Sequence, residues 1–272
     1  MKIFTDPAKL QKWALAARRN GRRIALVPTM GYLHDGHLSL IRRARALKAD
    51  EIVVSIFVNP VQFCPGEDYE KYPRDEKAYI AKCRAAGATA VFLPTPATMY
   101  LEGHSTGVSE RRLSSGLCGA RRPGHFDGVC TVVAKLFNIA QPDFAVFGRK
   151  DYQQAQVVRR MVRDLNFPVK IVVSPIVREL SGLAMSSRNT YLGEEERKSA
   201  IAISAGLRRM KRDRAFSLAR LRQSLEEAGL KVDYVECVDA ETLEKAKRPQ
   251  KGTCVLVAAY CGRTRLIDNV VL

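Results

Sequence analysis

The residues best suited to chemistry lie in the segment VPTMGYLHDGHLSL, residues 27–40, which holds two of the four histidines in the chain. His34 and His37 stand three residues apart, between an apolar run and an amphipathic pattern. A strand end and a helix start should therefore flank them. Two imidazoles beside a helix N-terminus can donate hydrogen bonds to a phosphate and stabilise charge that builds up on it. The segment is interpreted as the core of an active site that holds a nucleotide phosphate.

The spacing of Gly31 and Gly36 is similar to that of a P-loop, but His37-Leu38 follow where a P-loop has Lys-Ser/Thr. The lysine that grips phosphate and the hydroxyl that binds the metal are missing, which excludes a P-loop. The alternative to a phosphate-binding role, that one histidine is structural and the other merely exposed, remains open.

Two further segments follow apolar runs. Asn59 and Gln62 come after the run 52–58 and suit a hydroxy-acid or carboxylate substrate, although an ordinary capped turn would look the same. Lys150 and Asp151 come after the run 144–147, where the lysine can meet a phosphate and the aspartate can accept from a ribose hydroxyl. Gln154 lies one helical turn further on. The alternative for this second segment is a helix N-terminus capped by Asp151.

A last polar segment, Met185-Ser186-Ser187-Arg188-Asn189, follows the apolar run 169–173. Adjacent hydroxyls before an arginine can clamp a phosphate through charge-assisted hydrogen bonds. A plain polar loop is the alternative. Together with the histidine segment, a downstream lysine or arginine clamp indicates chemistry at a nucleotide α-phosphate, which means adenylyl or cytidylyl transfer.

The elements that must position these residues alternate along the first two thirds of the chain. Strands are predicted at 24–27, 52–58, 89–93, 144–147 and 169–173, and helices at 7–20, 40–48, 75–86, 129–137 and 152–165. Asp6 should cap the first helix, and Pro28 should end the first strand. This alternation predicts an α/β fold with a doubly wound parallel sheet, in which ligands bind at the carboxyl ends of the strands. The glycine- and serine-rich stretch 95–125 should form an irregular wall of the active site.

The last third of the chain has a different pattern. Helices are predicted at 194–211 and 218–228, followed by strands at 232–238, 254–260 and 264–267, the last two joined in a hairpin through Cys261-Gly262-Arg263. The sequence thus predicts two domains, a Rossmann-like domain at 1–176 that binds nucleotide and substrate, and a smaller α+β domain at 177–272.

Composition narrows the class of protein. The chain has 272 residues, 46% hydrophobic and 27% charged, with seven cysteines that form no CxxC pair. The cysteine pattern favours reduced thiols in a cytoplasmic protein, and no apolar run approaches a membrane-spanning length. The net charge of +17 is spread over many arginine pairs, so nucleic acid, an acidic membrane surface and anionic small substrates all remain compatible with charge alone.

The sequence resembles the pantothenate synthetase (pantoate–β-alanine ligase) family. The motifs that carry the resemblance are Pro28-Thr29-Met30-Gly31 with His34-x-Gly36-His37, Phe57-Val58-Asn59-Pro60-x-Gln62-Phe63, Tyr72-Pro73-Arg74, Arg122-Pro123-Gly124-His125-Phe126-Asp127-Gly128-Val129, Lys150-Asp151-Tyr152-Gln153-Gln154, Met185-Ser186-Ser187-Arg188-Asn189 and Arg263-Thr264-Arg265-Leu266-Ile267-Asp268-Asn269. HxGH alone occurs across a wide nucleotidyltransferase superfamily, but the combination in this order is specific.

The resemblance implies a two-step ligation with Mg-ATP. Pantoate would first become a pantoyl adenylate with release of pyrophosphate, and the amine of β-alanine would then displace AMP to give pantothenate. It also implies a homodimer and a C-terminal domain that closes as a lid. Such a reaction needs positioning and charge stabilisation rather than a covalent nucleophile, and the spread positive charge would draw in the two anions ATP and pantoate.

The resemblance also assigns residues. His34, His37 and Lys150 would be catalytic, Asn59, Gln62 and Gln154 would hold pantoate, and Gln62 would also contact β-alanine. The ATP contacts would be Met30, Gly31, Tyr32, Leu33, His34, Asp35, Gly36, His37, Gly148, Arg149, Lys150, Asp151, Val177, Met185, Ser186, Ser187 and Arg188.

Two positions depart from the family pattern. Tyr79 stands where the family usually has an aspartate near its magnesium, so no metal ligand is assigned, with Asp75 and Glu76 as possible substitutes. Arg149 replaces a common glutamate. Two rival functions are a cytidylyltransferase, which would lack the pantoate set, and a nucleic-acid-binding protein, whose binding would weaken steeply with salt.

Overall fold

The computed structural model describes residues 1–70, 72, 74–213 and 215–272, so Pro73 of the Tyr72-Pro73-Arg74 motif lies outside the described residues. The chain divides into two compact units. The first comprises Met1–Arg149 and Gln154–Ser174, and the second comprises Lys150–Gln153 and Pro175–Leu272. A single boundary after residue 176 does not describe this division, because Lys150–Gln153 group with the second unit.

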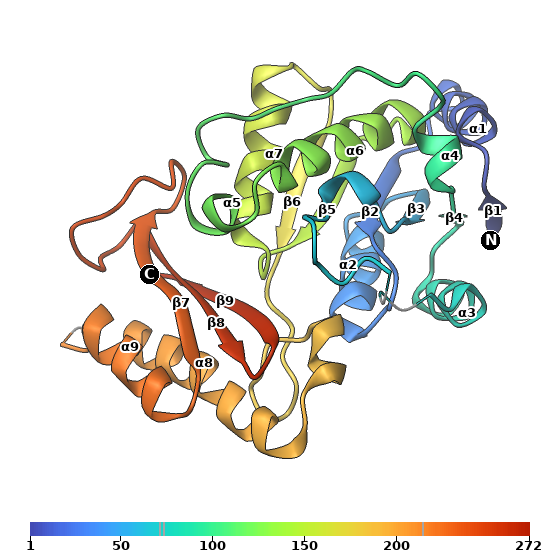
Figure 1. The fold of residues 1–272 in the computed structure, drawn as a ribbon. Coiled ribbons are helices and arrows are strands. Elements are labelled where there is room, and N and C mark those ends of the chain that lie inside the picture. The colour runs from blue at the N-terminus through green and yellow to red at the C-terminus, as the bar shows by residue number, and fades with distance from the viewer. Residues whose placement is uncertain (71, 73, 214) are drawn as a thin grey trace. The chain divides into compact units, whose positions relative to one another are not determined.

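The first unit is built on a parallel sheet whose described strands follow the order β1-β4-β3-β2-β5-β6 (Figure 1). The strands are β1 (Lys2–Phe4), β2 (Ile24–Thr29), β3 (Glu51–Ile56), β4 (Ala90–Phe92), β5 (Phe144–Gly148) and β6 (Lys170–Ser174). Every residue of β3 is buried, as expected for a parallel strand covered on both faces. The predicted α/β fold with a parallel sheet is confirmed, and β1 is an additional short edge strand.

Helices cover both faces of this sheet. The helices of the first unit are α1 (Pro7–Arg19), α2 (Asp35–Ala46), α3 (Glu76–Ala86), α4 (Pro96–Met99), α5 (Leu117–Arg121), α6 (His125–Ala140) and most of α7 (Tyr152–Asp164), with a 3-10 turn η1 (Pro60–Gln62). On one face, Leu40 and Ile41 of α2 and Cys83 of α3 pack with alternate residues of β2 and β3 in a single apolar cluster. Helices α1 and α6 contact each other and β2.

Local signals explain most of these boundaries. Asp6 accepts hydrogen bonds from the N–H groups of Ala8 and Lys9 and caps α1, as predicted. The prediction that Pro28 ends the first strand is wrong, because β2 continues to Thr29 and Pro28 pairs with Ser55 of β3. β2 pairs with β5 only at Ala25 and Leu26, so the missing N–H of Pro28 breaks no ladder bond on that side.

The second unit combines helices with an antiparallel sheet of order β7-β8-β9 (Figure 1). Its elements are η2 (Ser187–Tyr191), α8 (Glu194–Arg212), α9 (Leu218–Glu227), β7 (Lys231–Asp239), β8 (Thr253–Cys261) and β9 (Thr264–Val271). Cys261 pairs with Thr264, so the predicted hairpin turns through Gly262-Arg263, with Gly262 at φ +56°. The predicted α+β arrangement is confirmed, although β9 runs four residues further than expected.

Candidate active site

The start of the loop after β2 is held by hydrogen bonds of Thr29 and by a close contact with Tyr79. The Thr29 hydroxyl donates to the Ser55 carbonyl (2.8 Å) and accepts from the Gly31 N–H (3.3 Å). Gly31 has φ +95°, and a Cβ there would lie 2.9 Å from Cε2 of Tyr79. Only glycine fits this conformation and this close approach, so Tyr79 forms part of the wall that shapes the loop.

His34 and His37 lie at the N-terminus of α2, as the sequence predicted. His34 is the N-cap residue, and its Nδ1 accepts the Gly36 N–H at 3.1 Å. The Nδ1 of His37 accepts the His34 N–H at 3.5 Å, and the two half-buried rings lie 4.1 Å apart between centroids. A ring nitrogen that accepts a hydrogen bond carries no proton, so in each neutral ring the proton lies on Nε2. Both rings can therefore donate from Nε2 to an anion, in the favourable field of the helix N-terminus.

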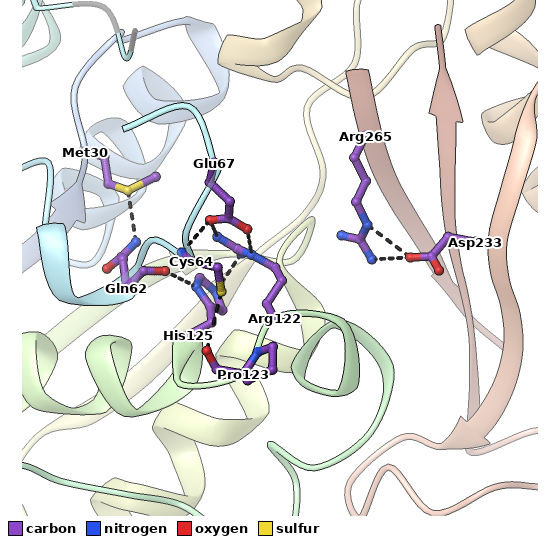
Figure 2. Close-up of polar contacts among 9 residues, drawn as sticks. All are labelled: Met30, Gln62, Cys64, Glu67, Arg122, Pro123, His125, Asp233 and Arg265. Atoms are coloured by element: carbon purple, nitrogen blue, oxygen red, sulfur yellow. Dashed lines mark hydrogen bonds and ion pairs between the residues drawn. The ribbon is translucent and has the colours of Figure 1, made fainter. Parts of the chain in front are cut away.

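Asn59 and Gln62 form a second cluster at the end of β3. Both side chains are almost fully buried, and Asn59 Nδ2 donates to Gln62 Oε1 (3.1 Å). Gln62 Nε2 lies 3.0 Å from the sulfur of Met30, which links this turn to the histidine loop (Figure 2). Tyr100, which the sequence analysis missed, donates from its hydroxyl to Asn59 Oδ1 (2.7 Å). Burial raises the pKa of Tyr100 to about 12 despite the opposing hydrogen bond, so the hydroxyl stays a neutral donor.

Gly128 of α6 is the point on which the Gln62 turn rests. Its carbonyl accepts from Asn59 Nδ2 (3.1 Å), and a Cβ at this position would lie 2.5 Å from the Val61 carbonyl oxygen and 2.6 Å from Cα and N of Gln62. Helix and turn can approach this closely only because position 128 has no side chain.

Replacing Gly128 by alanine should displace the Gln62 turn, because the atoms it would meet are backbone atoms that cannot rotate away. We expect a loss of ~1–3 kcal/mol in the free energy of unfolding, measured by urea denaturation, together with weaker substrate binding. Gly116→Ala is the matched control, since a Cβ at Gly116 meets nothing within 4 Å and its φ is −102°. Equal stability of the two variants would contradict the proposed contact.

The Gly148–Gln154 motif, which the sequence presents as one stretch, is divided between the units. Gly148 ends β5, the Arg149 N–H donates to the Ser174 carbonyl (2.9 Å), and Gln154 belongs to the same first unit. Lys150 and Asp151 belong to the second unit, where the Lys150 carbonyl accepts from Asn269 Nδ2 at 3.0 Å. Tyr152 reinforces this placement by donating its hydroxyl proton to the Ala240 carbonyl (2.7 Å).

The serine–arginine segment lies in the same second unit. Ser186 is the N-cap of η2, its hydroxyl oxygen accepts the Arg188 N–H (3.3 Å), and residues 185–188 are half-buried. The Met185 N–H donates to the Val177 carbonyl (3.0 Å), which places these two predicted ATP contacts side by side. Asn189 fixes the end of the segment by donating from Nδ2 to Glu179 Oε1 (2.8 Å) and to the Ala184 carbonyl (3.0 Å).

Strand β9 anchors two parts of the second unit, the loop that begins at Arg178 and the backbone of Lys150. Asp268 is buried and forms a two-bond ion pair with Arg178, at 2.6 and 3.0 Å, and Arg178 also donates to the Gly182 carbonyl. Its neighbour Asn269 holds Lys150, as described above. The motif that ends in Asp268-Asn269 was visible in the sequence, but its anchoring role was not, because it depends on contacts about 90 and 119 residues apart in the chain.

The described side chains do not build a metal site. Among them no group of three His, Cys, Asp or Glu residues is placed to hold a metal ion. Tyr79 is buried against Gly31, and the carboxylate of Asp75 is engaged in capping α3 through the Ala78 N–H (3.0 Å). Both Asp75 and Glu76 lie exposed at the start of α3.

Burial makes two of the cysteine thiols very weak acids. The seven cysteines are thiols rather than disulfides, and burial raises the pKa of Cys83 and of Cys130 to about 12. These two thiols therefore stay protonated at neutral pH. No helix in the described part of the chain is long and apolar enough to cross a membrane.

An ion pair lies beside the Gln62 turn. Arg122 donates from Nε and Nη2 to the two carboxylate oxygens of Glu67, at 2.6 and 2.7 Å (Figure 2). Burial raises the pKa of Glu67, but the hydrogen bonds and charge of Arg122 and the hydrogen bond from the Cys64 N–H outweigh it, so the net pKa lies below 4.5.

The Glu67 carboxylate should therefore contribute to stability above pH 4.5, and this contribution should vanish as the pH falls through the lowered pKa. We expect the difference in Tm between wild type and Glu67→Gln to be constant from pH 7 to about 5 and to shrink below that. Thermal melts at a series of pH values measure it. A difference that grows on acidification would contradict the sign.

Comparison with known proteins gives a consistent result. The family model described as pantoate-β-alanine ligase matches residues 2–271. Pantothenate synthetase of Anaeromyxobacter dehalogenans is 54% identical over 98% of this chain and 97% of its own length. The crystal structure of pantothenate synthetase from Thermus thermophilus has a TM-score of 0.91 and 45% identity, with 99% of both chains covered. That of pantoate-β-alanine ligase from Francisella tularensis, described as complexed with "Beta-gamma ATP and Beta-alanine", has a TM-score of 0.86 and 32% identity over 100% of this chain and 97% of its own.

The motifs along the whole chain, the fold of both units and these matches favour a ligase over the cytidylyltransferase alternative. The chain belongs to the pantoate–β-alanine ligase family.

Proposed function

We propose that this protein condenses pantoate with β-alanine in an ATP-dependent reaction, forming pantothenate, AMP and pyrophosphate through a pantoyl adenylate. The observation that carries the proposal is the pair His34 and His37, whose Nδ1 atoms accept backbone N–H groups and whose Nε2–H groups can therefore donate to an α-phosphate. The family match over residues 2–271 supplies the substrates.

In the first step a carboxylate oxygen of pantoate attacks the α-phosphorus of ATP. The bond to the oxygen that bridges to the β-phosphate breaks, and pyrophosphate leaves with that electron pair. Negative charge grows on the α-phosphoryl oxygens during this attack. We assign its stabilisation to the Nε2–H groups of His34 and His37 and to the N-terminus of α2.

In the second step the amine of β-alanine attacks the acyl carbon of the pantoyl adenylate. The amine loses a proton, the acyl carbon–oxygen bond breaks, and AMP leaves with the oxygen that came from pantoate. A carboxylate resists attack by an amine until its oxygen becomes a good leaving group, and adenylation provides one. The protein needs mainly to hold the reactants in line and to exclude water.

Binding roles follow the chemistry of the side chains. In the first unit we assign pantoate to Asn59, Gln62 and Gln154, and the amine of β-alanine to the neighbourhood of Gln62. In the second unit we assign the phosphates of ATP to Lys150 and to the segment Met185–Arg188, with Asp151 and Val177 as further ATP contacts. Magnesium would enter together with ATP as Mg-ATP.

Assembly and location extend the same proposal. The family resemblance favours a homodimer, which sedimentation would test. The cysteine pattern favours a cytoplasmic location. The second unit would act as the lid.

The direct test is to incubate the protein with ATP, Mg²⁺, pantoate and β-alanine, and to follow AMP and pantothenate. AMP should form only when pantoate is present, and pantothenate only when β-alanine is also present. AMP formation that did not depend on pantoate would overturn the proposal.

A further inference from the structure

The segment Arg122–Gly128 has no part in the mechanism above, yet it contacts the Gln62 turn and the loop behind it. Gly128 packs on the turn without a side chain and accepts from Asn59. His125, which is 7% exposed, places Nδ1 2.7 Å from the backbone carbonyl of Gln62. The carbonyl of Pro123 accepts from the thiol of Cys64 at 3.4 Å.

Elementary chemistry fixes the direction of the hydrogen bonds in this cluster. A carbonyl oxygen only accepts, so Nδ1 of His125 carries the proton and donates it to Gln62. A guanidinium only donates, so Nε2 of His125 must accept from Nη1 of Arg122, at 2.9 Å. The two hydrogen bonds thus form a chain that runs in one direction only, from Arg122 through His125 to the Gln62 carbonyl (Figure 2). His125 is neutral in this arrangement, because a second ring proton would face the donor of Arg122.

Glu67 completes the cluster at the other end of the loop. It binds Arg122 through both oxygens, and its Oε2 also accepts the Cys64 N–H at 3.2 Å. The segment 62–67 is therefore held at both ends by neighbouring residues, by His125 at Gln62 and by Arg122 at Glu67. An Arg–carboxylate pair with two parallel bonds is geometrically strict, so it transmits a defined position to His125.

We propose that Glu67, Arg122 and His125 are positioning residues that set the Gln62 turn for pantoate. The inference rests on the proposed function, because it takes Gln62 as a pantoate contact. The backbone carbonyl of Gln62 accepts from His125, so the turn is fixed at its main chain as well as through the side-chain contacts of Gln62 with Asn59 and Met30. Loss of the chain should let the turn shift, which weakens pantoate binding while leaving the ATP groups of α2 in place.

The first test compares two carboxylates that each pair with an arginine. Glu67→Gln weakens the ion pair with Arg122, in which the Glu67 side chain is 22% and the Arg122 side chain 18% exposed (Figure 2). Asp233→Asn weakens the ion pair with Arg265, in which the Asp233 side chain is 9% and the Arg265 side chain 19% exposed (Figure 2). We expect Glu67→Gln to raise the KM for pantoate about 10-fold with the KM for ATP changed less than about 2-fold, since one strong hydrogen-bonded contact is worth about a factor of ten. Asp233→Asn should lower Tm and change neither KM. If Glu67→Gln changed both KM values equally, or behaved like Asp233→Asn, positioning would be wrong.

The second test separates the two nitrogens of His125. The amide nitrogen of asparagine can take the place of Nδ1, so His125→Asn keeps the donor to Gln62 and loses the acceptor for Arg122. The amide of glutamine reaches the position of Nε2, so His125→Gln keeps the acceptor and loses the donor. We expect His125→Asn to recover part of the pantoate affinity, because it keeps the donor to Gln62 but breaks the link to Arg122. His125→Gln should resemble His125→Ala. The reverse order would overturn the direction assigned to the chain.

Failure of the positioning role and failure of the proposed function give different results. Wild-type protein that forms no AMP from pantoate would remove the function, and the positioning role with it. Active wild type with an unchanged KM for pantoate in both Glu67→Gln and His125→Gln would remove the positioning role alone.

Discussion

Replacing His34 or His37 by alanine is expected to lower kcat by about 10²–10³-fold each, the usual effect of losing one donor to a developing oxyanion. Each ring uses Nδ1 within the α2 N-terminus and presents Nε2–H as a donor. The charge that these donors meet is larger in the transition state than in bound ATP. The loss should therefore fall mainly on kcat, with a smaller change in the KM for ATP. Steady-state measurement of AMP formation with saturating pantoate and β-alanine gives both constants.

His34 also caps a helix, so its alanine variant loses stability as well as a phosphate donor. Removing an N-cap costs ~1 kcal/mol. His34→Asn separates the two effects, because asparagine is a good N-cap residue that can accept the Gly36 N–H but does not reach the position of Nε2. It should melt close to wild type and still lose kcat. Unchanged kcat in His34→Asn and His37→Ala would refute the role given to the pair.

Replacing Lys150 by alanine should lower kcat/KM for ATP by about 10²-fold, because a cation beside a phosphate is worth up to ~3 kcal/mol when hydrogen-bonded. The ammonium group of Lys150 lies 3.5 Å from Asp151, and the backbone of Lys150 is held by Asn269. The lysine is thus fixed to the second unit from both its side chain and its main chain. The measurement is kcat/KM from initial rates over a range of ATP concentrations.

Two variants serve as controls for Lys150. Asn269→Ala removes the donor to the Lys150 carbonyl and should raise the KM for ATP by a smaller factor. Lys198→Ala removes an exposed lysine of α8 that pairs with Glu195 and should leave all constants unchanged. If Lys198→Ala reduced kcat/KM as much as Lys150→Ala, general positive charge rather than a specific contact would be responsible.

The sequence predicted the elements of the fold well where the signal is local. Runs such as 52–58, with apolar and β-branched residues, favour a buried parallel strand, and the cap at Asp6 is read directly from residue type. β1 was missed because Lys2–Phe4 is too short to show a period, and it forms only by pairing with β4. Pro28 was misjudged because its effect depends on which neighbour strand is present, and strand order is not local information.

The candidate site, like the fold, was predictable from the sequence only where the signal is local. Residue types and spacing identified the segments around His34, Gln62, Lys150 and Ser186, since each follows a strand. They did not show that Lys150 groups with the second unit while Arg149 and Gln154 group with the first, because that depends on Asn269, more than a hundred residues away. Tyr100, Glu67 and His125 were missed for a similar reason. Their roles lie in contacts across loops, and only the motif around His125 left a trace in the sequence.

The central claim, that pantoate is activated by attack on the α-phosphorus, is tested most directly with pantoate labelled with ¹⁸O in its carboxylate. The oxygen that joins pantoate to phosphorus should leave with AMP when β-alanine attacks the acyl carbon. Mass spectrometry of the products should find one ¹⁸O in AMP and none in pyrophosphate. Formation of ADP with ¹⁸O in inorganic phosphate, or AMP without label, would contradict the account.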